Sequence, residues 1–520
     1  MEKEFNITGN CRPAKHYMAD VSGKLAKTLN LVEKGKYFMI NRPRQYGKTT
    51  TLHTIVDTLK KREDYVVFSI SFGGVGDAIF DNEIVFSEGF VNVLARYAQY
   101  QISDLAPWLR ETARTTKSLD DLSQVITRLV LKCDKNVVLL IDEVDKSSNN
   151  QLFISFLAML REKYLLQDSV KTFHSIVLAG VHDVKSLKLK IRAGEEAKLN
   201  SPWNIAAEFT VDMNLQPFEI KPMLDEYVAD KGVKMDTQKI ADRLFYYTSG
   251  YPFLVSKLCK MLDENSVPTK TSDEWVDDDL ETAVRLLVKE NNTNFESLVK
   301  NLENNEDLYD LVYKIVIDSM SLSFNIHNST INFGALYGIF VNKNGFIAIH
   351  NRIYNEVITS YMADNMHILQ LRRGADFGYG YKNDDNTLNM EAVLLGFQAF
   401  MKKEYSKKDR DFLEKNGRLV FLAFIKPIIN GSGYDFKEPQ ISEEKRLDVV
   451  LTYFQHKYVA ELKIWRGQKE HEKGLAQLSD YLDRQALTEG YLLIFDHSEV
   501  KKWDSGWIET PTKKIFSVWV

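Results

Sequence analysis

Residues 41–52, NRPRQYGKTTTL, follow an apolar run and combine residue types that bind phosphate. Gly47 lets backbone N–H groups turn toward a phosphate, Lys48 reaches the β- and γ-phosphate oxygens, and the Thr49 hydroxyl holds Mg²⁺. Arg42 stands where this pattern has its first glycine, so either the loop is stiffer or Arg42 and Arg44 add positive charge near the phosphates. An ordinary helix N-terminus is the alternative interpretation. The residues predicted to contact a nucleotide are Arg44, Gln45, Tyr46, Gly47, Lys48, Thr49 and Thr50.

A second apolar run, VVLLIDEVDK at 137–146, contains two adjacent carboxylates. Asp142 is placed to bind the same Mg²⁺ as Thr49, and Glu143 is placed to polarise the attacking water. Acidic strand ends are common, so this run alone decides little. Both elements lie at strand ends, in the order that the chemistry needs and about 95 residues apart. Together they predict ATP as the cofactor with Mg²⁺, and hydrolysis of that ATP.

Two further segments are candidates for sensing the nucleotide. A third strand ends at Gly180, after which His182 offers a polar group for the γ-phosphate; a structural role in the loop is the alternative. The tripeptide Gly250-Tyr251-Pro252 lies in a helical region and predicts that Pro252 closes over the nucleotide. A helix stop followed by proline at the first position of the next helix explains the same residues equally well.

Residues 1–290 resemble the AAA-ATPase-like family of bacterial proteins, which is related to the signalling P-loop ATPases of the STAND and archaeal-ATPase types. The segments that carry the resemblance are TGNCRPAKHYM, FMINRPRQYGKTTTL, LLIDEVDK, SPWNIA and TSGYPFLV. That family shares the arginine in place of the first loop glycine. The resemblance implies that the segment near His16 and Tyr17 borders the adenine and that residues 250–252 lie close to the nucleotide.

Another constellation lies at 443–465, EEKRLDVVLTYFQHKYVAELKIW. Asp448 is on one apolar strand, Glu461 and Lys463 are on the next, and the short link suits a hairpin. Glu461 and Lys463 are two residues apart and therefore point to the same sheet face. The two carboxylates are suited to share Mg²⁺ or Mn²⁺, while Lys463 stabilises the transition state of phosphodiester hydrolysis. An exposed, salt-bridged hairpin face is the alternative.

The helix expected at 468–484 places Gln477 and Tyr481 on one face. With that helix, residues 376–520 resemble the PD-(D/E)XK nuclease superfamily, in the branch often fused behind the ATPase family above. The matching segments are FIKPIINGSG, RLDVV, YVAELKIWRG and GLAQLSDYL. The resemblance implies metal-binding roles for Asp448 and Glu461, the catalytic lysine at Lys463, and a supporting helix that carries Gln477 and Tyr481. It also implies an acid from the first helix of the fold, for which Glu391 and Glu404 are the candidates.

Together the resemblances imply ATP-controlled cleavage of DNA, in defence against, or processing of, foreign or mobile DNA. The alternative is a nucleotide-switched nucleic-acid-binding or scaffold protein whose nuclease fold does not cut. ATP and DNA are the expected partners, and a homo-oligomer is left open. Candidate phosphate contacts on the DNA side, for which a solvated helix face is the alternative, are Lys402, Lys403, Lys407, Lys408, Arg410, Arg466 and Lys469.

The elements that must position these residues form an α/β pattern of three domains, at 1–215, 216–375 and 376–520. Apolar runs alternate with helices in the first domain, as buried strands of a parallel sheet do. The second is expected to be a helical lid that ends in a winged-helix-like hairpin and helix at 336–362, or in a plain hairpin without a nucleic-acid role. The third is expected to adopt the α/β nuclease fold, with helices at 390–404 and 468–484. The expected strands are 37–43, 65–72, 136–142, 174–180 and 206–213 in the first domain, and 418–425, 446–454, 457–465 and 490–495 in the third.

The composition limits the class of protein. The chain has 520 residues, of which 44% are hydrophobic and 27% charged, so a wholly disordered or collagen-like protein is excluded. The net charge is −5, and any nucleic-acid contact therefore needs a local basic patch. Three widely spaced cysteines form no disulfide framework and indicate a reducing compartment. Without a signal-peptide core or a run of about 18 apolar residues, we expect a cytoplasmic protein with no membrane contact.

Overall fold

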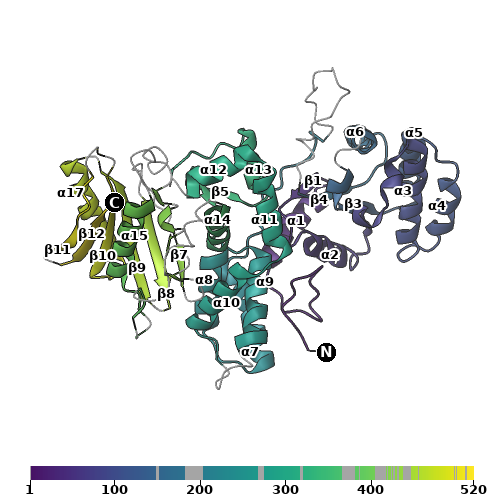
Figure 1. Ribbon diagram of the computed structural model, residues 1–520. Coiled ribbons are helices and arrows are strands. Elements are labelled where there is room, and N and C mark those ends of the chain that lie inside the picture. Colours follow the sequence, from purple (N-terminus) through teal and green to yellow (C-terminus); the bar gives the residue numbers. More distant parts are fainter. Residues whose placement is uncertain are drawn as a thin grey trace, which may run out of the picture. The chain divides into compact units, whose positions relative to one another are not determined.

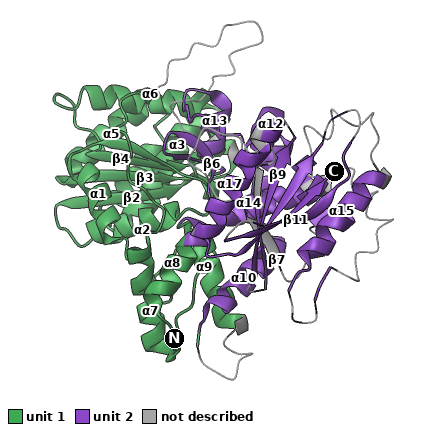
Figure 2. Ribbon diagram, turned by 90° about the vertical axis from the view of Figure 1, so that its left-hand side faces the viewer, with its two compact units in different colours: residues 1–245, 250–274, 336–338 green, residues 246–249, 275–335, 339–520 purple. Residues whose placement is uncertain are grey.

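The computed structural model divides into two compact units (Figure 2). Unit 1 comprises residues 1–245, 250–274 and 336–338, and unit 2 comprises residues 246–249, 275–335 and 339–520. The domain boundaries expected at 215 and 375 stay predictions. The described residues are 2–147, 151–181, 203–266, 274–316, 320–365 and 381–520, the last range with gaps at 384, 386, 405–416, 419, 423, 426–427, 430–432, 437–446, 455, 466, 497, 499–500 and 510–511.

Unit 1 contains a four-stranded parallel sheet with the strand order β1-β4-β3-β2. Strands β1, β4 and β3 of this sheet are labelled in Figure 1. The strands have buried apolar centres, as expected for a sheet that helices cover on both faces. They confirm four of the five strands expected in the first 215 residues. Their bounds are β1 (Tyr37–Asn41), β2 (Tyr65–Ser71), β3 (Asn136–Asp142) and β4 (Ser175–Gly180).

The strand predicted at 206–213 is wrong. Only Ala207 pairs with the sheet, as a single bridge to Phe38, and its N–H donates to Tyr37 O at 2.8 Å. Further along, the carbonyl of Val211 accepts a hydrogen bond from the Arg42 guanidinium at 2.8 Å. A side chain therefore takes the carbonyl that a sheet ladder would need, and the alternating pattern of this segment does not become a strand.

Helices surround this sheet, and the helices at 217–261, called the lid helices below, follow it in the chain. Helix α7 shows how local sequence sets their ends: it begins with Pro217, where a missing N–H is harmless, and ends before Gly232, which has a φ of +71°. Gly232 is thus the C-cap of α7. The helices are α1 (Ser22–Glu33), α2 (Lys48–Leu59), α3 (Glu83–Ala98), α4 (Leu105–Ala113), α5 (Leu119–Cys133), α6 (Gln151–Leu165), α7 (Pro217–Lys231), α8 (Thr237–Thr248) and α9 (Pro252–Met261), with short 3₁₀ turns η1 (Phe72–Gly74), η2 (Asp77–Phe80) and η3 (Val144–Ser147) and the π turn η5 (Leu262–Ser266).

The first part of unit 2 is helical and ends in a hairpin and a helix, as expected. Asn344 and Gly345, both with positive φ, make the two-residue turn of the hairpin. Leu336, expected to begin a strand, instead ends a helix. The elements are α10 (Asp277–Lys289), α11 (Thr293–Glu303), α12 (Glu306–Val316), α13 (Ser329–Leu336), β5 (Phe340–Lys343), β6 (Phe346–Ile349) and α14 (Arg352–Asn365).

The second part of unit 2 is a six-stranded mixed sheet with the order β11-β12-β10-β9-β8-β7. Strands β7, β8 and β9 are antiparallel, whereas β10 and β12 run parallel to β9. Both helices expected here are confirmed. The elements are α15 (Met390–Glu404), β7 (Gly433–Phe436), β8 (Leu447–Tyr453), β9 (His456–Ile464), α17 (Gln468–Arg484), β10 (Glu489–Phe495), β11 (Ser505–Glu509) and β12 (Lys514–Trp519).

The strand predicted at 418–425 is wrong, because the described residues there are helical. Its buried apolar residues are Val420, Phe421, Leu422, Phe424 and Ile425, which include two pairs at the four-residue spacing of a helix. A short continuous apolar run does not distinguish a buried helix from a buried strand. None of the described helices combines the length and the apolar character that a membrane span requires.

Candidate functional site

The loop between β1 and α2 has the backbone of a phosphate cradle. Gly47 has a φ of +77°, and a Cβ placed on it would have no heavy atom within 4 Å. The left-handed backbone therefore requires glycine there, and open space lies beside it. Helix α2 begins at the next residue, so its unpaired N–H groups and positive dipole end favour an anion at this point.

The Lys48 ammonium group is held by the loop itself. Its Nζ donates to the carbonyls of Arg42 and Pro43, each at 2.7 Å. Burial lowers the pKa of Lys48 to about 8, although the negative charges of Asp145 and Asp142 oppose this change. The lysine therefore provides a positive charge at the loop, and phosphate oxygens are able to replace its two carbonyl partners.

Thr49 and Asp142 meet as the sequence predicted. The Thr49 hydroxyl donates to Asp142 Oδ2 at 2.7 Å, and Asp142 is only 8% exposed at the end of β3. The other oxygen, Oδ1, accepts the Glu143 N–H at 2.8 Å. A hydroxyl and a carboxylate in contact are the hard oxygen donors that Mg²⁺ prefers, so these residues fit that ion.

Glu143 is held in a defined position by two residues that the sequence analysis missed. The Ser71 hydroxyl, at the end of β2, donates to Glu143 Oε2 at 3.1 Å. A Cβ on Gly73 would lie 1.3 Å from the same oxygen, so Gly73 leaves the space that the carboxylate fills. Ser71 pairs with Asp142 in the sheet register. The sequence signal that could have identified Ser71 is that a polar residue ends the strand next to the one that Asp142 ends.

Asp145 joins the ends of two neighbouring strands. Both of its carboxylate oxygens accept the Val181 N–H, at 2.8 and 2.7 Å. It lies in η3 directly after β3, whereas Val181 follows β4. This bond fixes the start of the segment that leads to His182, and His182 itself lies outside the described residues.

The Arg42 guanidinium binds backbone carbonyls, which favours a stiffer loop over added charge as the interpretation of this residue. Its guanidinium donates to Val211 O at 2.8 Å and to Asn41 O at 2.9 Å, and lies 5.3 Å from the centre of the Phe209 ring. Burial lowers the pKa of this guanidinium. Arg42 is therefore an anchor that stiffens the loop against the segment before α7.

Two tyrosines connect the loop to the lid helices within unit 1. Tyr46 donates to Asn214 Oδ1, and its ring packs edge-on against Tyr251 with centroids 4.6 Å apart. The Tyr251 hydroxyl donates to Arg44 O at 2.7 Å. Pro252 begins α9, and within the tripeptide 250–252 it is Tyr251 that contacts the loop; the closure of Pro252 over the nucleotide stays a prediction.

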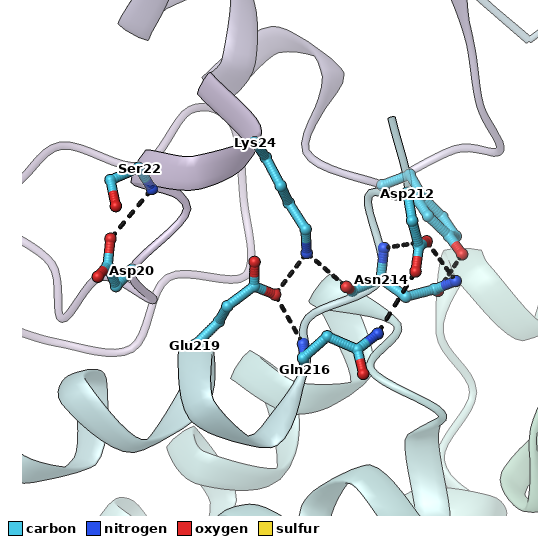
Figure 3. Close-up of polar contacts among 8 residues, drawn as sticks. Asp20, Ser22, Lys24, Asp212, Asn214, Gln216 and Glu219 are labelled. Carbon is cyan, nitrogen blue, oxygen red and sulfur yellow. Dashed lines mark hydrogen bonds and ion pairs between the residues drawn. The ribbon is translucent and has the colours of Figure 1, made fainter. Parts of the chain in front are cut away.

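A polar network supports the partner of Tyr46 (Figure 3). Lys24 of α1 donates to the carbonyl of Asn214 and forms an ion pair with Glu219 of α7. Glu219 also accepts the Gln216 N–H at 2.7 Å. The segment between the sheet and the lid is thereby tied to both α1 and α7, and through Asn214 to the phosphate loop.

Residues 336–338 also reach the loop, which the sequence did not indicate. Gly338 has a φ of +70°, and a Cβ on it would lie 2.6 Å from Pro43 Cγ. Burial, followed by the negative charge of Asp145, raises the pKa of the neighbouring Tyr337. These three residues precede β5 in the chain and belong to unit 1.

The N-terminal segment crosses the start of α2. The Cys11 N–H donates to the Thr50 hydroxyl at 3.1 Å, so Thr50 holds this segment in place. Tyr17 packs against Phe5 and Tyr227 and donates to Asp230 Oδ2 at 2.6 Å. His16 Nδ1 accepts the Arg12 N–H at 2.8 Å. The contact of His16 and Tyr17 with adenine stays a prediction.

The second constellation assembles in part on β8 and β9. Asp448 lies directly opposite Glu461 in the sheet register; its side chain is outside the described residues. Glu461 is 2% exposed, and its Oε1 lies 2.9 Å from Lys463 Nζ. Lys463 also donates to Gln477 Oε1 at 3.3 Å, and a Cβ on Gly474 would lie 3.1 Å from Lys463 Cε. Helix α17 thus lies against the lysine through Gln477 and Gly474, and the supporting role of Gln477 and Tyr481 stays a prediction.

The acid expected from the first helix of the nuclease fold has two candidates, Glu391 and Glu404. Glu391 Oε2 accepts the Trp507 indole N–H at 3.2 Å, and the side chain of Glu404 lies outside the described residues. Within the described part of the chain, no three His, Cys, Asp or Glu side chains gather as a metal would require. Of the basic candidates, only Lys402 has a described side chain.

Comparisons with known proteins support the first site. A family model for the AAA-like domain matches residues 14–356. No curated protein matches the sequence. Solved structures with some similarity are a Walker-type ATPase of Pyrococcus abyssi (12% identity, 68% of this chain and 99% of that chain, TM-score 0.44), a variant of RuvB from Thermotoga maritima (14%, 64% and 92%, 0.35) and ORC2 of Aeropyrum pernix (14%, 69% and 97%, 0.36). These TM-scores are all below 0.5, so the similarities establish neither fold nor function.

The pKa of Lys48 predicts how ATP binding depends on pH. Below pH 8 the ammonium is charged, and above it the free protein loses the proton that an anionic ligand needs. The dissociation constant for ATP should therefore rise about tenfold between pH 7 and pH 9, measured by calorimetry at constant Mg²⁺. The arginine in Lys48→Arg stays charged over this pH range, so the dissociation constant of that variant for ATP should not rise. A parental constant that stays level over the same range would contradict the account.

Proposed function

Since this chain belongs to the AAA-like domain family, we propose that its phosphate loop binds ATP with Mg²⁺ and that the site hydrolyses the nucleotide. The observation that carries the proposal is the 2.7 Å hydrogen bond from Thr49 to Asp142. It brings a loop hydroxyl and a strand-end carboxylate together beside the Lys48 ammonium. This is the donor set that a magnesium-bound triphosphate needs.

The chain's own residues divide the work. Thr49 and Asp142 would hold Mg²⁺, which when bound neutralises charge on the β- and γ-phosphates. Lys48 exchanges its bonds to the loop carbonyls for bonds to phosphate oxygens. Glu143 accepts the proton of the attacking water, and to do so it must exchange the Ser71 hydroxyl for that water. Ser71 is therefore a positioning residue that holds the Glu143 carboxylate in place before the water binds.

Two substitutions separate binding from turnover. Lys48→Ala should abolish ATP binding in calorimetry, because the point charge for the phosphates is lost. Glu143→Gln should bind ATP like the parent but release phosphate about 100-fold more slowly, because only the base is lost. Lys60→Ala, at the other end of α2, is the matched control and should resemble the parent in both assays. Parental affinity in Lys48→Ala would refute the phosphate-loop assignment, and parental turnover in Glu143→Gln would move the base elsewhere.

We propose further that the C-terminal part is a metal-dependent DNA nuclease under the control of this ATPase. Support comes from the order α15-β7-β8-β9-α17-β10, which places two helices around a hairpin-bearing sheet. It also comes from the register of Asp448 with Glu461 and the contact of Lys463 with Glu461. Glu461 is a buried carboxylate, which requires a nearby cation; Lys463 supplies one, and Mg²⁺ or Mn²⁺ bound with Asp448 would supply another.

The roles of these residues differ, so their variants should fail differently. Lys463→Ala should stop plasmid cleavage but keep metal binding, because the lysine is the cation beside the reacting phosphate and does not bind the metal. Asp448→Ala should lose both. Lys457→Ala, on the same strand β9 and bonded to Gln485, is the control and should cut normally. Cleavage at the parental rate by both Lys463→Ala and Asp448→Ala at saturating Mg²⁺ would refute the nuclease assignment.

A second function has one observation in its favour. Glu461 Oε1 is already paired with Lys463 Nζ at 2.9 Å. A nuclease fold in this state is suited to grip nucleic acid or a protein partner without cutting it. If the parent protein fails to cut DNA with Mg²⁺ and with Mn²⁺, in every nucleotide state, this nucleotide-switched binding protein becomes the better proposal.

A further inference from the structure

The ends of three parallel strands meet at one edge of the C-terminal sheet. Strands β9, β10 and β12 run in the same direction, so their carboxyl ends lie at the same edge. Trp465 follows β9, with its N–H bonded to Phe495 O at 2.9 Å, and Trp519 ends β12. The two indoles lie 4.6 Å apart, and the ring of His471 lies 5.7 Å from the first and 6.0 Å from the second.

Three lysines lie over two tryptophans, Trp503 and Trp519. Lys402 of α15 lies 5.3 Å from the Trp503 ring, and Lys501 lies 5.2 Å from it. Lys502 lies 5.7 Å from the Trp519 ring. The basic–aromatic edge is defined here as Trp465, Trp503, Trp519, Lys402, Lys501 and Lys502. Its members come from separate stretches of the sequence, so no single sequence motif predicts the edge.

The backbone that presents the edge is fixed. The Lys502 N–H donates to Asp496 Oδ2 at 2.9 Å, and the Trp519 N–H donates to Asp504 O at 2.9 Å. Gln398 of α15 donates to the carbonyls of Asp504 and Trp519, at 3.1 and 2.8 Å. The backbone at these positions therefore needs little ordering when a ligand binds.

Three acids near the edge, among the residues that the structure describes, accept hydrogen bonds from neighbouring groups. Asp496 is buried, and its two oxygens accept the N–H groups of Ser498 and Lys502 at 2.9 Å each. Glu472 accepts from Gln468 at 3.2 Å, and Asp504 accepts the Ser505 N–H at 2.9 Å. The edge thus presents cationic groups on aromatic faces, a combination that suits phosphates alternating with flat bases.

The edge adjoins the proposed cleavage site. Glu461, Lys463 and Trp465 are two residues apart along β9 and share one face of the sheet. Lys463 contacts Gln477 of α17, and Trp465 packs against His471 in the first turn of the same helix. A strand lying along the edge would therefore lead toward Lys463.

We propose that the basic–aromatic edge binds an unpaired DNA strand, whose bases stack on the tryptophans and whose phosphates pair with the lysines. A duplex hides the faces of its bases, so it has less to offer these rings. This proposal rests on the proposed function in one respect, namely that the C-terminal part acts on DNA. It adds the class of substrate, a single-stranded or unpaired segment, and names the surface that selects it.

The test measures binding without cleavage. Fluorescence anisotropy of the full-length protein with a labelled oligothymidine, in EDTA, should give a smaller dissociation constant than a duplex of the same length. Trp503→Ala should weaken single-strand binding about tenfold, and Trp503→Tyr should restore most of it, because a ring is retained. Lys501→Ala combined with Lys502→Ala should lower the slope of log affinity against log salt by about 1.4, since two phosphate contacts are lost.

Two controls match these variants in residue type. Trp507→Ala removes a partly exposed tryptophan of β11 that bonds to Glu391, and Lys457→Ala removes a lysine at the other end of β9. Both should bind the oligothymidine like the parent. Equal affinity in the parent, Trp503→Ala and the double lysine variant would overturn the proposal, as would tighter binding of the duplex.

Tryptophan and lysine also gather on membrane-binding surfaces, so a third ligand is included. Binding to anionic phospholipid vesicles that the edge variants abolish, without oligothymidine binding by the parent, would overturn the proposal in favour of a membrane. Because the assay contains no metal, its result is separate from that of the nuclease assay. A parent that binds the oligothymidine through this edge but never cuts DNA would uphold the edge and refute only the nuclease.

Discussion

The half-buried ammonium group of Lys48 is the constraint on which the nucleotide site depends. Charge in a desolvated position costs free energy unless hydrogen bonds and opposite charges compensate for it. Here the carbonyls of Arg42 and Pro43 supply two charge-assisted bonds, each worth about 1.5–3 kcal/mol. Asp142 and Asp145 add negative charge nearby. An incoming phosphate offers stronger partners, so the lysine can exchange carbonyls for phosphate oxygens without being left unpaired.

That exchange matters beyond the loop because the same backbone is held from outside. Arg42 is anchored by Val211, Pro43 touches Gly338, and the carbonyl of Arg44 accepts from Tyr251. Each contact joins the loop to a segment that leads into the lid. A small movement of the loop on nucleotide binding would change several of these contacts together, and a coupling of about 1.4 kcal/mol would be enough for tenfold control.

The sequence predicted the parts of the site that follow from local spacing. Lys48 and Thr49 open the helix that follows β1, and Asp142 ends β3, so periodicity and chain order suffice to bring them to one edge of the parallel sheet. Ser71, Gly338 and the basic–aromatic edge were missed, because each arises where chain segments far apart in the sequence meet. The strand expected at 206–213 failed for a related reason: its carbonyl at Val211 is taken by a distant arginine. The apolar run at 418–425 failed because its length did not distinguish helix from strand.

The central claim of this account is that nucleotide at the phosphate loop controls cleavage of DNA by the C-terminal part. The most direct measurement is the rate at which full-length protein nicks supercoiled plasmid in Mg²⁺ with no nucleotide, with ADP and with a non-hydrolysable ATP analogue. We predict a difference of about tenfold or more between at least two of these states, and no difference in Lys48→Ala. Cleavage by the parent at one rate in all three states would contradict the claim.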